Sequence, residues 1–475
     1  MTYDLLVLGG GTGGLVSAMI AAGAGARVAL VERDRTGGDC LWTGCVPSKS
    51  LLAAAGLAHA MRHADRVGLP PATPTVDLAA VLDHVRAAQA TIAPHDSVER
   101  LTAAGVDVLV GEGRFTGPRT LTVDGRPVRF RRAIVATGSR AVVPPVPGLA
   151  ALAPLTHETV WELRALPARL AVLGAGPIGC ELGQALGRLG SRVTLLESGD
   201  RPLRGEEPEA SALLAEQLRE DGIDLRLGVR VTAAARGADG AIRLTLGDAQ
   251  ELVADAVLVA AGRAPRSDGI GLDAAGVRCD AGGAIVVDPT MRTSAAGIFA
   301  VGDVVGAPAF THVAAHHARQ AAVNALFGLR RRADRTPLPW VTFTDPEVAH
   351  VGLTVAQARE RHGERVVVAR STYAGLDRAI AAGEHRGGAI LVGDARGRLV
   401  GATLVGRGAG ESIAELTAWI ATGAKLARVS GTVHAYPTYA GAAVRAVDDH
   451  LRKRYAGPGL RRALAPVLAA RRLVR

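Results

Sequence analysis

The sequence predicts an α/β fold in which one strand–helix–strand unit occurs twice and a smaller α+β domain follows. The repeat pairs "YDLLVLGGGTGGLVSAMIAAGAGARVALVERD", which begins at Tyr3, with "RLAVLGAGPIGCELGQALGRLGSRVTLLESGD", which begins at Arg169. Each copy reads as an apolar strand, a glycine loop, a helix of small residues, a second strand and an acid. From Trp340 the pattern changes to a β-like stretch, "WVTFTDPEVAHVGLT", and later a helical one, "ESIAELTAWIATGAKL", which indicates a separate C-terminal domain.

Length and composition are those of a globular protein. The chain has 475 residues, which at roughly 150 residues per domain suggests about three domains. Apolar residues make up 48% and charged residues 21%. Four cysteines are too few for the disulfide framework of a secreted protein, which favours a reducing, cytoplasmic setting. No basic leader precedes the first apolar run and no stretch of about 18 apolar residues occurs, so we expect neither a signal peptide nor a transmembrane segment.

Both copies of the repeat carry a G-x-G-x-x-G motif with an acid at the same distance from it. The residues are Gly9, Gly11, Gly14 and Glu32 in the first copy, and Gly174, Gly176, Gly179 and Glu197 in the second. The first glycine permits a tight turn, the second lets the backbone approach a pyrophosphate, and the third lets helix and strand pack closely. The acid accepts hydrogen bonds from ribose hydroxyls. Two such motifs in matched contexts predict two Rossmann-like domains, each holding a dinucleotide.

Two of the four cysteines lie close together in "GGDCLWTGCVPSK", residues 37–49. In a regular helix, residues five apart rise about 7.5 Å along the axis, which exceeds the roughly 7 Å limit between the Cα atoms of a disulfide. Cys40 and Cys45 can therefore form a bond only where the helix is distorted. Gly44 loosens the backbone there, and Pro47 would clash with the carbonyl of Thr43 in a regular helix. We favour a redox pair, with half of a zinc site or a chance occurrence as the alternatives, and no second Cys/His pair at zinc spacing accompanies it.

These features resemble one family. Two dinucleotide folds, a C-x4-C pair after the first, "ATG", "GD" and a terminal α+β domain resemble the FAD-dependent pyridine nucleotide–disulfide oxidoreductases. The resemblance covers about residues 1–450 and is strongest to the dihydrolipoyl dehydrogenase and mercuric reductase branch, where "GCVPSK" recurs. It implies an FAD domain at 1–149 and 282–337, an NAD(P) domain at 150–281, a dimerisation domain at 338–450 and a basic tail at 451–475. A homodimer whose active sites take residues from both subunits is expected.

The resemblance also implies residue roles. Glu32 would contact the adenosine ribose of FAD and Asp303 its ribityl chain. Cys45 would face the flavin, Cys40 would be the interchange thiol that attacks an external disulfide, and Lys49 would lie beside the flavin, paired with Glu181. Turns at the ends of three further apolar strands, 133–140, 256–265 and 297–306, supply the remaining candidate cofactor-binding residues, which are Thr137, Gly138, Gly262 and Gly302. Cys180 and Cys279 are isolated and are expected to be buried or incidental thiols.

NADH is the expected nicotinamide substrate, with NADPH as the alternative. Glu197, at the end of its strand, accepts ribose hydroxyls and repels a 2′-phosphate. Arg192 and Arg201 stand near it in the sequence and would partly offset that repulsion.

The chain departs from the family pattern at two places. Mercuric reductases typically end in a cysteine pair, whereas this chain ends "AARRLVR". In the dihydrolipoyl dehydrogenase branch a histidine precedes Pro-Thr and a glutamate follows it by five residues, and this pair moves the thiol proton. The aligned residues here are Tyr436 and Gly441, within "VHAYPTYAG". His434 is the candidate substitute, with a packing role as its alternative. Tyr436 either packs, hydrogen-bonds a substrate thiol or ligates a soft metal.

The sequence favours a flavin-dependent disulfide reductase acting on a small disulfide. A quinone or soft-metal reductase on the same fold and a non-catalytic nucleotide-binding subunit are the alternatives. Residues 451–475 contain eight Lys or Arg residues and no acid, out of a net charge of +10. We expect a solvated basic helix there, with an anionic membrane surface as a second possibility and no nucleic-acid partner.

Overall fold

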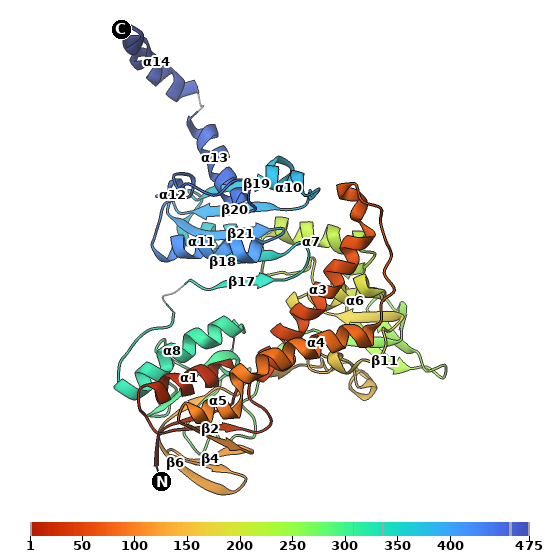
Figure 1. The fold of residues 1–475 in the computed structure, drawn as a ribbon, viewed down its shortest axis with the longest axis vertical. Coiled ribbons are helices and arrows are strands. Elements are labelled where there is room, and N and C mark those ends of the chain that lie inside the picture. Colours follow the sequence, from red (N-terminus) through yellow and green to blue (C-terminus); the bar gives the residue numbers. More distant parts are fainter. Residues whose placement is uncertain (1, 307, 335–336, 456–457, 474–475) are drawn as a thin grey trace. The chain divides into compact units, whose positions relative to one another are not determined.

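The computed structural model describes residues 2–306, 308–334, 337–455 and 458–473 (Figure 1). The chain forms two compact units. The larger unit comprises Met1–Ala60, Thr73–Asp200 and Asp221–Thr336, and the smaller unit comprises Met61–Ala72, Arg201–Glu220 and Pro337–Arg475. The predicted domains were defined by the cofactor that each is expected to bind, whereas the two units are defined by their internal contacts. The predicted boundaries therefore stay predictions.

The first copy of the repeat lies in a seven-stranded sheet of the larger unit, with strand order β3-β2-β1-β6-β5-β4 and β16 beside β6. β1 runs parallel to β2 and β6, and Leu8 at its end pairs with Val31 and with Val135. The strands are β1 (Thr2–Leu8), β2 (Val28–Glu32), β3 (Val106–Val110), β4 (Gly113–Gly117), β5 (Thr120–Val123), β6 (Arg126–Val135) and β16 (Ile298–Ala300). The apolar run of β1 is buried on both faces, as expected for a central parallel strand.

Helices of small residues cover this sheet. α1 (Thr12–Gly23) and α8 (Thr311–Phe327) lie side by side (Figure 1). Ala18 of α1 and Ala318, Ala321 and Ala322 of α8 are fully buried in one core. Their short side chains let the two helices pack closely, and the predicted helix of small residues in the first repeat is α1. The other helices that begin in this unit are α2 (Gly38–Trp42), α3 (Cys45–Arg62), α4 (Leu78–Ile92) and α5 (Val98–Ala103).

The second copy of the repeat forms a four-stranded parallel sheet, also in the larger unit, with order β10-β9-β8-β14. Its strands are β8 (Arg169–Leu173), β9 (Arg192–Glu197), β10 (Asp224–Leu227) and β14 (Ala256–Val259), and α6 (Pro177–Leu189) follows β8. β11 (Val231–Arg236), β12 (Ile242–Leu246) and β13 (Glu251–Ala254) form an antiparallel sheet next in the chain. β7 (Ser139–Ala141) pairs antiparallel with β15 (Arg263–Pro265), which joins segments that flank the second repeat.

The smaller unit is built on a five-stranded antiparallel sheet, order β17-β18-β21-β20-β19. The strands are β17 (Pro339–Thr342), β18 (Val348–Gly352), β19 (Val367–Thr372), β20 (Gly388–Gly393) and β21 (Leu399–Val405). α11 (Ala409–Ala421) and α13 (Gly441–Tyr455) pack on it and bury Ile413, Leu416 and Val447. The remaining helices are α7 (Pro208–Glu220), α9 (Val355–His362), α10 (Asp377–Ala381), α12 (Leu426–Ser430) and α14 (Pro458–Leu473).

The predicted fold class, two dinucleotide-type α/β domains followed by an α+β domain, is confirmed. Among the described residues, no helix combines the length and the apolar character needed to cross a membrane.

Candidate functional site

The cysteine pair lies where two helices meet. α2 ends at Trp42 and α3 begins at Cys45, so the helix predicted to be distorted is in fact interrupted. The amide of Gly44 donates to the carbonyl of Asp39 at 2.6 Å, a bond that spans five residues instead of four. Pro47 falls in the first turn of α3, where its missing N–H costs no helical hydrogen bond. This break brings Cys40 close enough to hydrogen-bond Cys45.

The two thiols are electrostatically different. Both are free in the structure and partly exposed. The hydrogen bond from Cys40 lowers the pKa of the Cys45 thiol, and contacts with Thr311 and the charge of Lys49 lower it further. That same hydrogen bond, together with burial and the charge of Asp39, raises the pKa of Cys40. The Cys45 Sγ lies 3.3 Å from Oγ1 of Thr311, at the start of α8. The pair is therefore arranged to hold a thiolate at Cys45 and a proton at Cys40.

Lys49 and Glu181 form the predicted ion pair. The Lys49 Nζ lies 2.8 Å from Oε2 of Glu181, and the lysine also donates to Ser48 at 3.3 Å. Lys49 stands one turn after Cys45 on α3, whereas Glu181 stands on α6 of the second repeat. The side chain of Glu181 is 8% exposed and that of Lys49 is 36% exposed. The buried carboxylate thus fixes a more accessible cation near the thiols.

The glycine loops of the two repeats have the same geometry. Gly9 and Gly174 adopt φ of +107° and +102°, the left-handed region that favours glycine. A Cβ on Gly14 would lie 1.8 Å from the Gly9 oxygen, and one on Gly179 would lie 1.9 Å from the Gly174 oxygen. These four glycines are therefore required for the turn and for close helix packing.

Gly11 and Gly176 serve a different purpose. They cap α1 and α6 without any side-chain cap, so first-turn amides at both helix starts remain available to an anion. A Cβ on Gly176 would meet no described atom within 4 Å, and one on Gly11 would come no closer than 3.7 Å to its nearest neighbour. Packing does not demand glycine at either position, whereas the approach of a pyrophosphate does. The two loops fit dinucleotides.

The acid of each repeat supports its own loop. Glu32 accepts a hydrogen bond from the Gly10 amide at 2.6 Å, and Glu197 accepts one from the Ala175 amide at 2.9 Å. Each carboxylate thus lies beside its glycine turn at the carboxyl end of a strand. This is where an adenosine ribose is bound in Rossmann-like domains.

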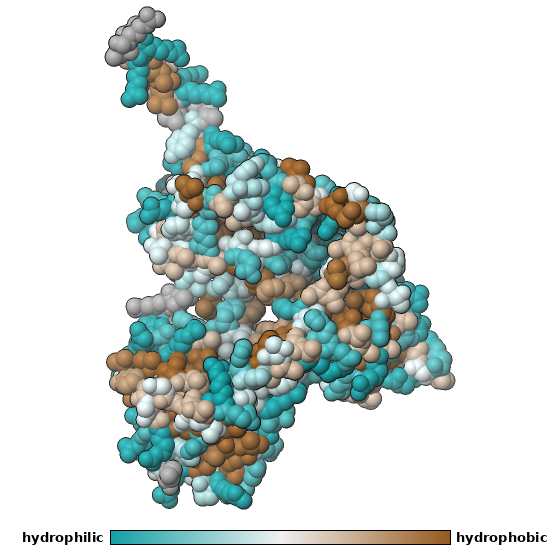
Figure 2. All heavy atoms as spheres, viewed as in Figure 1, coloured by the Kyte–Doolittle hydropathy of each residue, from teal (hydrophilic) through white to brown (hydrophobic). Residues whose placement is uncertain are grey.

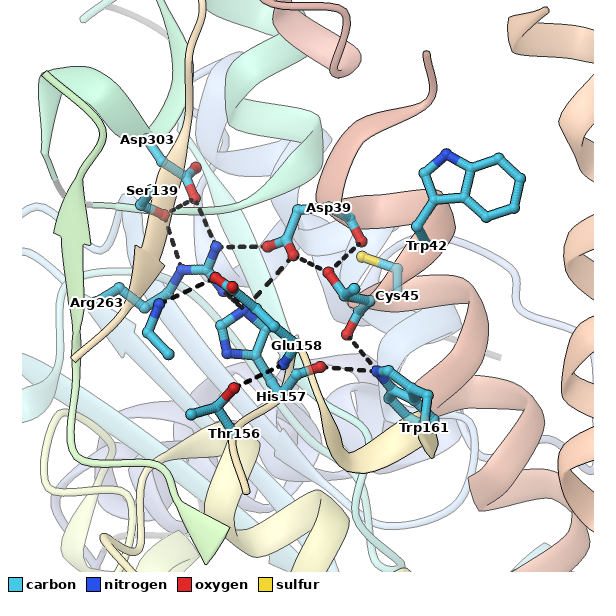
Figure 3. Close-up of polar contacts among 12 residues, drawn as sticks. Asp39, Trp42, Cys45, Ser139, Thr156, His157, Glu158, Trp161, Arg263 and Asp303 are labelled. Atoms are coloured by element: carbon cyan, nitrogen blue, oxygen red, sulfur yellow. Dashed lines mark hydrogen bonds and ion pairs between the residues drawn. The ribbon is translucent and has the colours of Figure 1, made fainter. Parts of the chain in front are cut away.

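A polar network adjoins the cysteine motif (Figure 3). Arg263 at the start of β15 is its centre, with Nη2 2.5 Å from Asp39, Nη1 2.6 Å from His157 and Nε 2.8 Å from Ser139. Ser139 donates to Asp303 at 2.7 Å, and Arg263 lies 3.6 Å from the same carboxylate. Burial would raise the pKa of Asp39, but its hydrogen bond with His157 and the charge of Arg263 hold that pKa well below its ordinary value. Asp39 is therefore an anion directly beside Cys40.

The remaining predicted cofactor residues are turn residues of the larger unit. The Thr137 hydroxyl donates to the Arg266 carbonyl at 2.7 Å. Gly138, Gly262 and Gly302 adopt φ of +73°, +139° and +73°, conformations that favour glycine. Gly302 precedes Asp303 in a short 3₁₀ turn, which places it at the network just described.

Sequence reasoning missed four members of this network, which are Asp39, Ser139, His157 and Arg263. Asp39 adjoins Cys40 and was visible in the motif. Arg263 lies 224 residues away in sequence, and no local pattern connects the two. The isolated Cys180 is buried, as expected, whereas Cys279 is exposed and takes no part in the site.

The predicted acid–base residues lie in the smaller unit. The nitrogens of His434 are each 2.8 Å from an oxygen, Nδ1 from the Thr432 carbonyl and Nε2 from Glu415 of α11. Both ring nitrogens therefore face oxygens of this same unit, which favours the packing interpretation of His434. Tyr436 is 79% exposed and donates to Asp377 at 2.5 Å, a hydrogen bond that raises the pKa of the phenol.

A cavity of about 330 Å³ surrounds these residues. Tyr436, Asp377 and His434 line it, together with Gly441. Gly441 has no side chain to contribute. The smaller unit therefore presents the exposed phenol of Tyr436 and the carboxylate of Asp377 where the family pattern has an imidazole and a glutamate.

Comparison with known proteins identifies the class. Residues 3–318 match the family described as Pyridine nucleotide-disulphide oxidoreductase, and residues 338–447 match its dimerisation domain. The chain belongs to this family of flavoprotein disulfide reductases. Its cofactors, FAD and NAD(P)H, are those that the sequence predicted.

Individual relatives differ in the substrates for which they are named. Glutathione reductase of Burkholderia cepacia is 36% identical over 442 residues, which cover 92% of this chain and 97% of that protein. Dihydrolipoyl dehydrogenase of Thermus scotoductus is 37% identical over 466 residues, 92% of this chain and 95% of that protein. The solved Cu(II) complex of the HOCl-induced flavoprotein disulfide reductase RclA from Escherichia coli has a TM-score of 0.84 at 26% identity and covers 92% and 98% of the two chains.

Proposed function

We propose that this reductase passes electrons from NADH, through FAD, to a disulfide between Cys40 and Cys45, and from there to a small-molecule disulfide. The observation that carries the proposal is the hydrogen-bonded thiol pair at the break between α2 and α3, with the Lys49–Glu181 ion pair beside it. A pair of incidental cysteines would need neither the interrupted helix nor a fixed cation.

The two thiols have separate roles in the chemistry, and the lowered pKa of Cys45 supports its role as the resting thiolate. Bound FAD supplies a two-electron relay between the nicotinamide and the thiol pair. Cys40 Sγ, once deprotonated, attacks one sulfur of the acceptor, which forms a mixed disulfide and releases the other half as a thiol after it takes up a proton. The Cys45 thiolate then attacks Cys40 Sγ, which closes the Cys40–Cys45 bond and releases the second thiol. Lys49 and Thr311 stabilise the thiolate at Cys45 between these steps.

Each of the two dinucleotides is assigned to one copy of the repeat. The first loop, with Gly9, Gly11, Gly14 and Glu32, holds FAD, and Asp303 contacts its ribityl chain together with the turns at Thr137, Gly138 and Gly302. The second loop, with Gly174, Gly176, Gly179 and Glu197, holds NADH, and Gly262 borders it. The similar turns and similar acid–amide bonds of the two loops support a dinucleotide at each loop.

The enzyme acts as a cytoplasmic homodimer through the smaller unit. The match of residues 338–447 to a dimerisation domain supports this assembly. Sedimentation equilibrium should give twice the chain mass of 48.7 kDa. A single-chain mass at micromolar concentration would reject it.

The decisive assay is anaerobic reduction by NADH followed by a panel of acceptors. We expect oxidised small disulfides to reoxidise the protein, and Cys40→Ser to abolish that step while NADH still reduces the bound FAD. Equal disulfide turnover in Cys40→Ser would reject the thiol route.

Reduction of a soft-metal ion is the second candidate. The observation in its favour is that the similar Escherichia coli reductase was solved as a Cu(II) complex. No cluster of three or more His, Cys, Asp or Glu residues suited to a metal lies within the described ranges, so the metal would be a substrate that meets the thiol pair. Including Cu(II) and Hg(II) in the acceptor panel separates the two candidates.

A further inference from the structure

The last described helix, α14, has no partner in the described chain. It has 16 residues, Pro458–Leu473, and residues 461–472 are all exposed. The exposure of these residues means that no other described element covers them. An exposed helix of this length is marginal in water, since most helical stability in proteins comes from packing. A surface outside this chain is therefore expected to cover it.

One side of α14 is apolar. Leu464, Val467 and Leu468 follow each other at the i, i+3, i+4 spacing that places side chains on one helix face. They are 45%, 54% and 53% exposed, and Figure 2 shows apolar residues on this helix bordered by hydrophilic ones. Such an uncovered stripe is typical of a helix that lies against an apolar surface.

The charges around the stripe have one sign. Arg461 and Arg462 precede it by one turn, and Arg471 and Arg472 follow it by one turn. α13 ends with three further cations, Arg452, Lys453 and Arg454. Residues 451–475 contain no acid, and of their eight cations Arg452 lies 3.3 Å from Asp449 of α13. The surface that covers α14 must supply both apolar contact and negative charge.

We propose that α14 lies in the headgroup region of a bilayer that contains anionic lipids, with its apolar stripe turned toward the acyl chains. Acyl chains cover the stripe and lipid phosphates pair with the arginines, which fits both features at once. Stacking α14 against its copy would bring like charges together, and a nucleic acid would leave the three aliphatic side chains exposed. Four arginines within 16 residues rule out a spanning orientation.

This placement of α14 determines where the enzyme works. The reductase works at a membrane surface, and it leaves that surface when salt screens the arginines. This inference does not depend on the acceptor or on the acid–base residue. A failed test of membrane binding would leave the proposed thiol chemistry unaffected.

Flotation of the full-length holoenzyme with vesicles tests the proposal. One set of vesicles is phosphatidylcholine alone, and the other contains phosphatidylcholine mixed with phosphatidylglycerol. The variants are Leu464→Ser/Leu468→Ser, which removes the stripe, and Arg461→Glu/Arg462→Glu, which reverses two charges. The matched control, Arg361→Glu/Arg365→Glu, makes the same charge change at exposed positions of the same unit.

We expect binding to the phosphatidylglycerol vesicles at low salt, and a loss of at least about tenfold in both α14 variants but not in the control. NADH oxidation with ferricyanide should stay unchanged in all of them. Failure of the wild type to float would overturn the proposal. So would flotation that survives both α14 variants, or an α14-dependent binding of single-stranded DNA or of a second copy without binding to vesicles.

Discussion

Cys45 is the residue that matters most to the proposed redox chemistry. Its thiol pKa is lowered first by the hydrogen bond from Cys40, so we expect the thiolate to form below the ordinary thiol value of 9.0. Cys40→Ser keeps a hydroxyl donor and should preserve the lowered pKa, whereas Cys40→Ala removes the donor and should raise it. The pH dependence of Cys45 alkylation by iodoacetamide in reduced protein measures both. Equal pKa values in the two variants would contradict this account.

We expect Glu197 to set the choice between NADH and NADPH. Its carboxylate lies beside the second glycine loop, where it would repel a 2′-phosphate. We expect Glu197→Ala to raise the ratio of kcat/KM for NADPH over NADH about tenfold or more, since removing such a repulsion is worth at least about 1.4 kcal/mol. The control is Glu32→Ala, the same change in the first repeat, which should leave this ratio unaltered. A wild type that prefers NADPH would refute the assignment.

Tyr436 should make this enzyme a poor dihydrolipoyl dehydrogenase. An exposed phenol that donates to Asp377, with a raised pKa, is a weak base at neutral pH. Restoring the family pair with Tyr436→His/Gly441→Glu should increase dihydrolipoamide oxidation by about 10²-fold or more, because general acid–base help is typically worth that much. Tyr436→Phe is the control and should give no gain.

A substitution at His434 distinguishes its packing role from an acid–base role. Because both of its nitrogens face oxygens of its own unit, His434→Ala should lower the melting temperature while kcat changes little. A collapse of turnover at unchanged stability would show that His434 handles the proton after all.

At the scale of elements, a buried carboxylate makes the smaller unit sensitive to pH. Burial raises the pKa of Glu206 from 4.5 to about 7, although Trp340 donates to it. The folded chain therefore holds this proton more tightly than the unfolded chain does. The resulting stability is fully present below about pH 4.5 and is lost as the pH rises through about 7. A shift of this size corresponds to at most roughly 3 kcal/mol.

Glu206→Gln should remove that dependence, because the amide keeps an acceptor for Trp340 and does not titrate. Measuring the apparent melting temperature of the variant and the wild type between about pH 5 and pH 8 checks this loss of pH dependence. Glu364→Gln, at an exposed side chain, is the control and should retain the wild-type slope. An unchanged slope in Glu206→Gln would exclude this carboxylate as the cause.

The elements themselves were largely predictable from the sequence. Both G-x-G-x-x-G loops lie between the strand and helix expected of them, because the first and third glycines of each motif are required by backbone geometry that local sequence reveals. The break at Cys45 was anticipated as a distortion from Gly44 and Pro47. The contacts of Arg263 with Asp39 and of His434 with Glu415 were not predictable, since tertiary folding alone brings these side chains together.

At the scale of the whole molecule, both glycine loops of the repeat lie in one unit, and the thiol pair follows the first of them in the sequence. The ion pair between Lys49 on α3 and Glu181 on α6 joins elements of the two repeats, and the Arg263 network joins β15 to the cysteine motif. Fixed charges thus connect the cysteine motif to α6 and β15. Its central claim is that Cys40 and Cys45 form the disulfide that NADH reduces.

Differential alkylation with mass spectrometry tests this claim most directly. The purified, air-oxidised holoenzyme is alkylated before and after anaerobic addition of NADH, and the peptide with both cysteines is examined. We predict that Cys40 and Cys45 are protected before NADH and both labelled after it, with the labelling of Cys180 and Cys279 unchanged. Labelling of Cys40 and Cys45 that is the same before and after NADH, while the FAD is reduced, would contradict the account.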